Sequence, residues 1–342
     1  MTAAQPVLTG PNSIANNIPE DVKQVFDQSS VYFPTSLQLF QYYDKYSRFD
    51  YTLGRREVWK ETVNRAVEYL KELSDNKLEE EDYKKVHQFI LEMKSAPSMR
   101  LLAMAGTAAR RQNISIYNCS FLPIDSIDSW VEALIISMSG CGVGFSVESK
   151  YVNKLPSVKK QEEKQAAKVH VVQDTTEGWA EAVRAGLKTW FSGLDLDFDF
   201  SEIRPAGTPL KVKGGTASGP DPLKKMLGFA RKIILSRQGK KLTPLQAHDI
   251  MCSVGDAAVS GGMRRTAMIS LFDYDDEEMR NCKNGDNLTG NEQRWNANNS
   301  AVWSVDTMTQ GEIARQILDM DEGQRGEPGI FSRDSANRWK PE

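Results

Sequence analysis

The chain has 342 residues, of which 40 % are hydrophobic and 26 % charged, enough for two domains or one large α/β unit with a helical extension. Its 43 basic and 46 acidic side chains give a formal charge of −3, which argues against a dedicated nucleic-acid-binding protein but leaves single nucleotides as ligands. Four separated cysteines, an N-terminus without a signal-peptide pattern and the lack of a run of ~20 apolar residues are typical of a reduced, cytoplasmic protein that does not enter a membrane.

Residues 1–20 are polar and are expected to form a flexible tail, followed by a helical N-terminal domain over residues 21–100. Between residues 57 and 95, apolar side chains recur at helical spacing in two runs, and Asp75-Asn76 separates them. The two runs therefore predict two helices whose charged faces lie in solvent. Their apolar positions are Val58, Val63, Val67, Leu70 and Leu73, then Tyr83, Val86, Phe89, Ile90 and Met93.

Residues 101–342 alternate strand-like and helical runs, a pattern that favours a largely parallel sheet or barrel. The segment 194–200 alternates apolar and acidic residues, which predicts a strand and explains its three aspartates without a metal cluster. Residues 150–168 are polar and lysine-rich, and they are expected to form a surface insertion. We expect strands at 114–117, 143–147 and 169–172, helices at 126–139, 176–191, 222–238 and 243–259, and one apolar strand face of Leu194, Leu196, Phe198 and Phe200.

Two cationic glycine loops are candidates for a nucleotide site. Residues 204–220 contain four glycines, three prolines, three cations and three hydroxyl side chains, and residues 260–266 form a second such loop. Backbone N–H groups, hydroxyls and cations together suit a polyphosphate. Neither loop has the Walker A spacing or a GxGxxG turn, so an irregular surface loop remains the alternative.

Cys119 stands after a predicted strand and before Pro123, and strand ends are where α/β proteins place chemistry. A lone cysteine is otherwise a small core residue.

Asp125 is positioned to cap the helix expected at 126–139. The glycines of 140–145 precede a strand. They therefore indicate close backbone packing where a helix turns into a strand, rather than a dinucleotide-binding fingerprint. Cys141 and Cys252 have no feature that activates them, nor does Cys282, which could be exposed beside Lys283.

These segments resemble the adenosylcobalamin-dependent (class II) ribonucleotide reductases, especially the monomeric ribonucleoside-triphosphate reductase type. The resemblance covers roughly residues 50–335, and its short motifs follow the family's order. The matching segments are 117–120 (YNCS), 142–147 (GVGFSV), 174–179 (DTTEGW), 203–207 (IRPAG), 214–220 (GGTASGP), 239–244 (GKKLTP), Arg264-Arg265, Arg294-Trp295, 298–300 (NNS) and 326–329 (GEPG).

The resemblance implies a ten-stranded α/β barrel with a central finger loop, of which this chain would hold an incomplete part after its helical region. It also implies thiyl-radical reduction of ribonucleotides to 2′-deoxyribonucleotides, with adenosylcobalamin as radical source. A cysteine pair would become a disulfide and be recycled by thioredoxin or a similar dithiol, and a dNTP at a separate site would select the base to be reduced. Triphosphates are the expected substrates, in the cytoplasm of a cell or of the host of a phage that encodes the protein.

Residue by residue, the resemblance makes Cys119 the first cysteine of the reducing pair. No metal-ligand set is expected. Lys211 stands where related reductases often have arginine, so it keeps the charge without the bidentate fork. The implied substrate residues are Asn118, Ser120 and Arg264; the effector residues are Asp125, Ser126, Arg204, Lys211 and Lys213; the specificity loop adds Gly261, Gly262, Met263 and Arg265.

The finger-loop motif Asn-Pro-Cys, which the family carries beyond the last matching segment, does not occur in this sequence. The expectation is therefore the N-terminal part of a reductase, from a truncated or split gene, that is inactive without a complementary C-terminal half. Two other interpretations remain open: the large subunit of a di-metal (class I) reductase, and a non-catalytic dNTP-binding protein. Residues 174–179 and 214–220 favour class II over class I.

Overall fold

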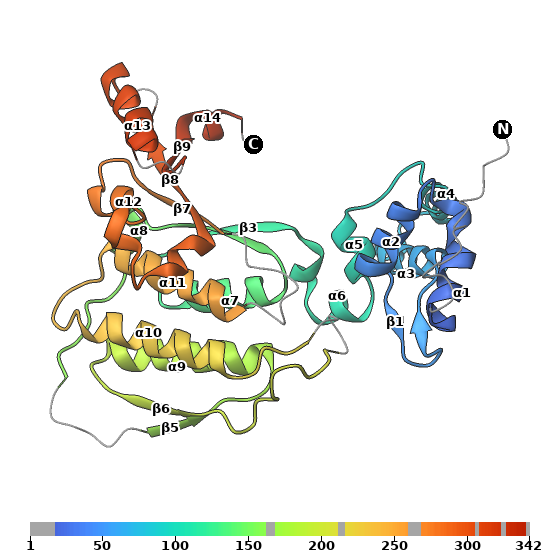
Figure 1. Cartoon of the computed structure of the whole chain (residues 1–342), viewed down its shortest axis with the longest axis horizontal. Coiled ribbons are helices and arrows are strands. Elements are labelled where there is room, and N and C mark those ends of the chain that lie inside the picture. The colour runs from blue at the N-terminus through green and yellow to red at the C-terminus, as the bar shows by residue number, and fades with distance from the viewer. Residues whose placement is uncertain are drawn as a thin grey trace. The chain divides into compact units, whose positions relative to one another are not determined.

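The computed structural model describes residues 18–161, 168–210, 216–258, 268–304, 308–322 and 326–339. These residues form two compact units, one up to Tyr117 and one from Asn118 onward, and each is described by itself (Figure 1). Among the described residues, no helix has the length and apolar character needed to cross a membrane.

The first unit consists of helices around an apolar core with a small antiparallel ribbon. The predicted helices of 57–95 are confirmed, and Asp75 and Asn76 between them adopt the left-handed conformation, with φ of 50° and 56°. The elements are α1 (Glu20–Ser29), α2 (Ser36–Lys45), β1 (Phe49–Asp50), β2 (Arg55–Arg56), α3 (Trp59–Leu73), α4 (Glu80–Leu91), α5 (Met99–Met104) and α6 (Thr107–Arg111), with 3-10 turns at Ser30–Tyr32 and Asn113–Ile116.

Two expectations for this region are wrong. The helical unit does not end at residue 100, because Leu101, Leu102 and Ala109 pack into the same core as α3 and α4. The segment 114–117 is not a strand; Asn113–Ile116 is a 3-10 turn whose Ile116 also packs against that core.

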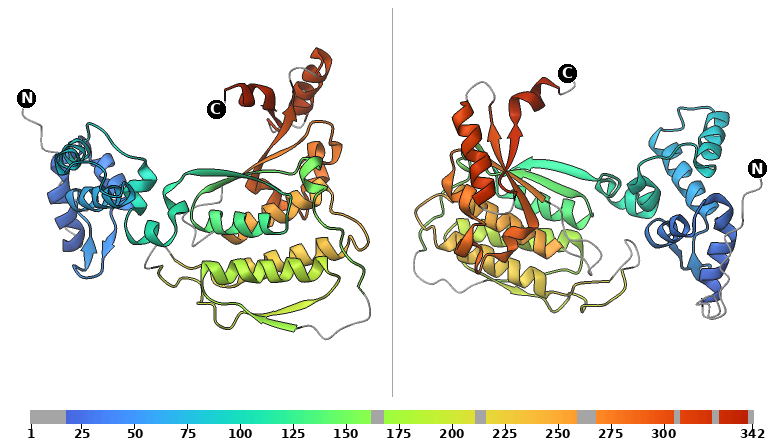
Figure 2. Two further views of the ribbon diagram at one scale, coloured as in Figure 1. Left: turned by 180° about the vertical axis from the view of Figure 1, so that it is seen from behind. Right: turned by 45° about the horizontal axis from the view of Figure 1, so that its top comes forward.

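The second unit is built on a five-stranded parallel sheet in the order β3-β4-β7-β8-β9. Helices α7 and α11 cover one face of the sheet, α9 and α10 form the next layer, and the ribbon β5-β6 lies beyond them (Figures 1 and 2). The sheet does not close into a barrel within the described residues. The strands are β3 (Cys119–Pro123), β4 (Gly142–Ser146), β5 (Lys168–Val171), β6 (Leu196–Asp199), β7 (Met268–Asp273), β8 (Ala297–Trp303) and β9 (Gly329–Ser332).

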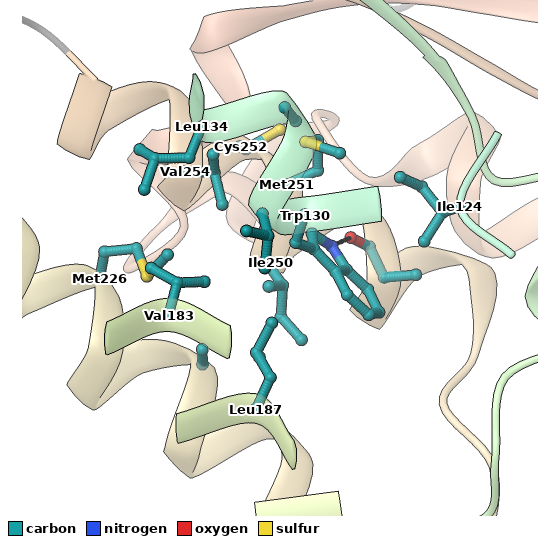
Figure 3. Packing of buried hydrophobic residues seen from close by; sticks show 14 of the residues in the cluster. Ile124, Trp130, Leu134, Val183, Leu187, Met226, Ile250, Met251, Cys252 and Val254 are labelled. Atoms are coloured by element: carbon teal, nitrogen blue, oxygen red, sulfur yellow. Dashed lines mark hydrogen bonds between the residues drawn. The ribbon is translucent and has the colours of Figure 1, made fainter. Parts of the chain in front are cut away.

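The helices of this unit begin and end close to the predicted bounds. They are α7 (Asp128–Met138), α8 (Ser149–Val152), α9 (Thr176–Phe191), α10 (Asp221–Leu235), α11 (Pro244–Ala258), α12 (Glu277–Asn281), α13 (Gln310–Glu322) and α14 (Arg333–Arg338), with 3-10 turns at Gly285–Leu288 and Glu292–Asn296. Figure 3 shows the core between them, where Trp130 of α7 lies among Ile250 of α11 and Leu187 of α9. The Trp130 Nε1 donates to the Ala247 carbonyl at 3.3 Å, so the buried indole N–H is paired.

Two further expectations need correction. The segment 150–168 is not a surface insertion throughout, because Val152, Leu155 and Val158 are buried in the core; its residues 162–167 lie outside the described part. Strand β6 is shorter than predicted: Leu194 precedes it and is exposed, whereas Phe198 and Phe200 pack against the core.

Candidate functional site

The second face of the parallel sheet, opposite α7 and α11, carries Cys119. One row of neighbouring residues crosses β3, β4, β7 and β8 on this face: Phe121, Gly144, Ile269 and Asn298. The side chains of Phe121, Ile269 and Asn298 are exposed. Cys119 lies two residues before Phe121 on β3, so its side chain points to the same face, and the thiol is exposed. The interpretation of Cys119 as a core residue is therefore wrong.

Next to Cys119, strand β4 has two glycines, which place no side chain on the sheet. Gly142 is paired with Cys119, and Gly144 with Phe121. A Cβ at residue 144 would stand 2.9 Å from the Phe121 ring and 3.1 Å from Ile269 Cγ2, so these two side chains close over the glycine. The preference for close packing over a dinucleotide fingerprint is confirmed, since both glycines lie inside a strand.

The other two predicted substrate residues that the structure describes flank the thiol. Asn118 is exposed, and its carbonyl accepts from the Gly142 N–H at 2.8 Å. Ser120 is half-buried, and its hydroxyl donates to the Gly142 carbonyl at 3.1 Å. The three residues thus lie together at the start of β3, with Asn118 and Cys119 accessible and the Ser120 hydroxyl bonded to β4.

Asp125 and Ser126 lie past the other end of β3. The five-residue strand spans about 13 Å between its first and last residues at ~3.3 Å per residue, so they are distant from Cys119. The Lys154 ammonium lies 3.5 Å from the Asp125 carboxylate, and the Ser126 and Ser129 hydroxyls are 3.2 Å apart. The predicted cap is wrong, because α7 begins at Asp128 without a side-chain cap.

Arg204 is held by Asp174. Its Nε lies 2.5 Å from the Asp174 carboxylate, and its Nη2 lies 3.5 Å from the Asp174 carbonyl. Asp174 precedes Thr175, whose hydroxyl caps α9 by accepting from the Gly178 N–H at 2.9 Å. This pair fixes the guanidinium beside the first turn of α9 while leaving it half-exposed.

The effector candidates do not form one cluster in the described residues. Arg184 of α9 pairs with Asp128 at 2.7 Å, which places the Asp125 end of α7 next to residue 184. Asp174 is ten residues earlier, about 15 Å away at 1.5 Å per helical residue. A hollow of about 410 Å³ lies between these positions, lined by Ile135, Gln173, Glu177, Gly178, Ala180, Glu181 and Arg184.

Seven of the predicted site residues lie outside the described part of the chain. These are Lys211 and Lys213 of the first cationic loop and Gly261, Gly262, Met263, Arg264 and Arg265 of the second.

A buried polar network that the sequence did not indicate joins α11 to the segment before β8. The Arg294 guanidinium bonds both carboxylate oxygens of Asp249, at 2.6 and 2.7 Å. His248 lies 3.0 Å from the Ser270 hydroxyl, and its Nε2 lies 3.4 Å from Cys252 Sγ. The Arg294–Asp249 and His248–Ser270 contacts join residues 45 and 22 positions apart, so spacing along the sequence could not reveal them.

Burial sets the protonation of this network. It lowers the pKa of His248 to about 3, and the charges of Lys283 and Arg294 act in the same direction. Burial also raises the pKa of the Cys252 thiol well above its ordinary value and that of Cys282 to about 11. Cys282 is buried, so the suggestion that it could be exposed is wrong. Burial and a raised pKa both disfavour the reactive thiolate form of these two cysteines in the folded chain.

Comparisons with known proteins agree with this arrangement. Sequence models match for the ribonucleotide reductase alpha domain over residues 19–107 and for the insertion domain of B12-dependent ribonucleotide reductase over residues 125–234. A crystal structure of a B12-dependent (class II) ribonucleotide reductase superposes with a TM-score of 0.76 and 26 % identity over 92 % of this chain and 51 % of that one. The chain belongs with the class II ribonucleotide reductases.

Two curated relatives share the name adenosylcobalamin-dependent ribonucleoside-triphosphate reductase. The adenosylcobalamin-dependent ribonucleoside-triphosphate reductase of Euglena gracilis is 33 % identical over 274 residues, covering 74 % of this chain and 37 % of the relative. The enzyme of the same name from Lactobacillus leichmannii is 30 % identical over 361 residues, covering 86 % and 48 %. The chain thus spans about half the length of the relatives it matches, or less.

The described residues do not form a site that fits the corrinoid of these relatives. His248 is buried against Ser270, His87 is bonded to Asn64 and His170 contacts the Phe198 ring, so no described histidine is placed to meet such a large ligand. The described residues also contain no group of three or more metal-ligating side chains.

Proposed function

We propose that this chain supplies one redox cysteine and the dNTP effector site of a class II reductase that converts ribonucleoside triphosphates to 2′-deoxyribonucleotides. The observation that carries the proposal is the position of Cys119, exposed at the start of β3 on the sheet face opposite α7 and α11, while the other three cysteines are buried. A thiol that exchanges electrons with a substrate and then with a reductant has to be accessible to both.

The redox step requires a second thiol, because the reduction consumes two electrons and two protons. Two electrons and two protons from Cys119 and a partner cysteine reduce the 2′-carbon, the 2′-hydroxyl leaves as water, and a disulfide forms between the two sulfurs. Thioredoxin or a similar dithiol then reduces that disulfide by thiol–disulfide exchange. None of the other cysteines of this chain suits the partner role, because all three are buried. The partner therefore belongs to a complementary C-terminal half.

Around the thiol, this chain's residues shape the substrate side of the pocket. The exposed Asn118 amide is available to hydrogen-bond a ribose or its phosphate. Adenosylcobalamin is the cofactor in the names of the relatives, and in this proposal the residues that would hold it belong to the complementary half. Strand β4 has no side chains at Gly142 and Gly144, and the Phe121 and Ile269 side chains beside it are apolar. In this proposal that apolar surface keeps water away from the reacting sugar.

For the effector, the described arrangement supports a phosphate site at Arg204. Its guanidinium is held by Asp174 and stays half-exposed at the first turn of α9. In our proposal Lys211 and Lys213 also bind the effector, the loop 261–265 is the specificity loop, and Arg264 binds the substrate. Asp125 and Ser126, which precede α7, are proposed to bind a more distant part of the same effector. A B12-dependent insertion domain over residues 125–234 supports class II over the class I large subunit.

The deciding experiment measures NTP reduction with adenosylcobalamin, a dithiol and dNTP effectors. It uses this chain alone and then with a polypeptide that carries the family's Asn-Pro-Cys segment. Activity that appears only with the second polypeptide and disappears in Cys119→Ser supports the proposal. Tight dNTP binding without reduction, with a second polypeptide that binds cobalamin, would instead identify a non-catalytic dNTP-binding protein.

A further inference from the structure

Two segments of the second unit carry positive charge only. Residues 149–161 contain four lysines, residues 222–248 contain seven lysines and arginines, and neither segment contains an aspartate or a glutamate. The whole chain has 43 basic and 46 acidic side chains, so its composition does not explain this separation of charge. Where the two segments meet, they are a candidate surface for an anionic partner.

Backbone hydrogen bonds join the two segments just beyond the C-terminal end of α10. The Val158 N–H donates to the Lys240 carbonyl at 2.9 Å, and the Gly239 N–H donates to the Val158 carbonyl at 2.7 Å. The lysines at 159–160 and 240–241 are therefore close neighbours, and all four are exposed. We call the five cations at this junction the α10 cation strip: Lys159, Lys160, Arg237, Lys240 and Lys241.

Two members of the strip have a structural role. The Arg237 Nε donates to the Lys241 carbonyl at 3.0 Å, and the Lys241 ammonium donates to the Asn153 carbonyl. Cations near carbonyls at the end of a helix are stabilising, so these two contacts support the turn after α10. Three exposed lysines of the strip form no ion pair among the described residues: Lys159, Lys160 and Lys240. Their charges are therefore available to a partner.

The contact of Lys241 with Asn153 extends the strip to an aromatic ring. Asn153 follows α8, which carries the half-buried Tyr151. The ammonium groups of Lys150 and Lys154 lie 4.9 and 5.5 Å from the centre of the Tyr151 ring. Surfaces that bind single-stranded nucleic acid combine cations that follow the phosphates with aromatic rings on which bases stack. An acidic peptide would need the cations but not the ring.

The strip is distant from both parts of the proposed reductase site. Helix α10 has 15 residues, so its C-terminal end lies about 22 Å from the loop 204–220 that precedes it, at 1.5 Å per residue. Helix α8 follows the C-terminal end of β4, whereas Cys119 stands at the N-terminal end of the parallel strand β3. Figure 1 shows α8 and the C-terminal end of α10 on the same side of the unit. An anion bound to the strip is therefore neither a substrate at Cys119 nor an effector at Arg204.

We infer that the α10 cation strip binds single-stranded nucleic acid, with phosphates on its lysines and a base on the Tyr151 ring. The lysines lie exposed along two neighbouring segments, which suits a chain of repeating phosphates better than one compact phosphate group. The formal charge of −3 argues against a protein that is basic throughout, and a local strip is compatible with it. The inference is independent of the proposed function, since it involves neither Cys119 nor Arg204.

The test follows the fluorescence anisotropy of a labelled oligo(dT) strand of about 20 nucleotides, titrated with the full chain at several salt concentrations. The strip variant Lys159→Ala/Lys160→Ala/Lys240→Ala removes the three lysines that form no described ion pair. We expect it to bind at least tenfold more weakly than wild type. The slope of log affinity against log salt concentration should become shallower by about 2, at ~0.7 for each lost phosphate contact.

The matched control removes three exposed lysines of the first unit, so that both variants have the same net charge. It is Lys60→Ala/Lys84→Ala/Lys85→Ala, and it should bind like wild type. Tyr151→Leu keeps every charge and removes the ring, so it should weaken binding of the strand by about tenfold. A urea midpoint is measured for each variant, and a value equal to that of wild type shows that the variant is folded.

Equal affinity of wild type and the strip variant for the strand, or no binding by wild type at low salt, would overturn the inference. Wild-type affinity in Tyr151→Leu would overturn nucleic acid as the partner. So would displacement of the strand by polyglutamate at the same concentration of charges, because the surface would then fit an acidic protein. Displacement by a dNTP would place the strand on a nucleotide site and would also overturn the strip as the binding surface.

Discussion

The Arg294 guanidinium bonds both carboxylate oxygens of Asp249, and both side chains are buried, at 7 % and 8 % exposure. The same guanidinium donates to the carbonyls of Cys282 and Asn287, each at 2.7 Å. It therefore connects α11 to the two segments that lead into β8. Such a pair gives little net stability over an apolar pair, but breaking it leaves one charge buried and uncompensated.

Asp249→Ala should therefore lower the free energy of unfolding by about 3–5 kcal/mol, because Arg294 would stay buried without its partner. Urea unfolding followed by tryptophan fluorescence measures the change. Glu81→Ala, which removes an exposed i,i+3 pair with Lys84, is the matched control and should leave the midpoint unchanged. Equal midpoints for wild type and Asp249→Ala would show that the buried pair does not contribute as described.

Cys119 should be the thiol that reacts when the folded chain meets an aromatic disulfide reagent at pH 8. Cys141, Cys252 and Cys282 are buried, and burial raises the pKa of Cys252 and that of Cys282 to about 11. We expect one fast equivalent per folded chain, four in denaturant, and no fast equivalent in Cys119→Ser. Fast labelling that persists in Cys119→Ser would mean that another cysteine is accessible.

The helices of the second unit could be predicted well because local signals agree. The helix predicted at 176–191 has those bounds, since Thr175 caps it and its apolar residues keep helical spacing. The segment 114–117 was wrongly predicted as a strand, because Ile114 and Ile116 alternate with a serine as apolar residues do in strands. In the structure Ser115 is buried and Ile116 packs on the core of the first unit. Tertiary packing thus overrides the local pattern.

The candidate site could be predicted only in part. Resemblance identified Cys119, but its exposure follows from which face of the sheet α7 and α11 cover, and no local pattern encodes that. Phe121, Ile269 and Asn298, which share this face, come from three strands and were missed. The contact of Arg204 with Asp174 joins residues thirty positions apart, so spacing could not reveal it.

Arg204→Ala should weaken dNTP binding by about 10- to 100-fold, the loss of one charged hydrogen-bonding group worth ~1.5–3 kcal/mol. Arg204→Lys keeps the charge without the fork, so its affinity should fall between wild type and Arg204→Ala. Arg231→Ala is the matched control, because Arg231 also pairs with an aspartate, Asp195, in this unit. Calorimetric titration with each dNTP measures the effect. Unchanged affinity in Arg204→Ala would move the phosphate site elsewhere.

Gly144→Ala and Gly193→Ala should differ strongly in stability. At residue 144 the new methyl meets the Phe121 ring and Ile269, two exposed side chains that can move aside. At residue 193 it would stand 2.6 Å from the Lys160 carbonyl, on a backbone with φ of +74° that disfavours a Cβ. We expect a loss under about 1 kcal/mol for Gly144→Ala and several times more for Gly193→Ala. Similar thermal midpoints would contradict this contrast.

His248 should make the chain less stable in mild acid. Burial lowers its pKa in the folded state to about 3, while the unfolded chain has an ordinary value near 6.5. Below pH 6.5 the unfolded state binds a proton that the folded state does not, so this stabilisation is complete above pH 6.5 and declines as the pH falls toward 3. The slope from this group approaches about 1.4 kcal/mol per pH unit. Urea midpoints measured between pH 7 and pH 4.5 should therefore fall more steeply for wild type than for His248→Gln, whereas parallel curves would show that His248 does not titrate this way.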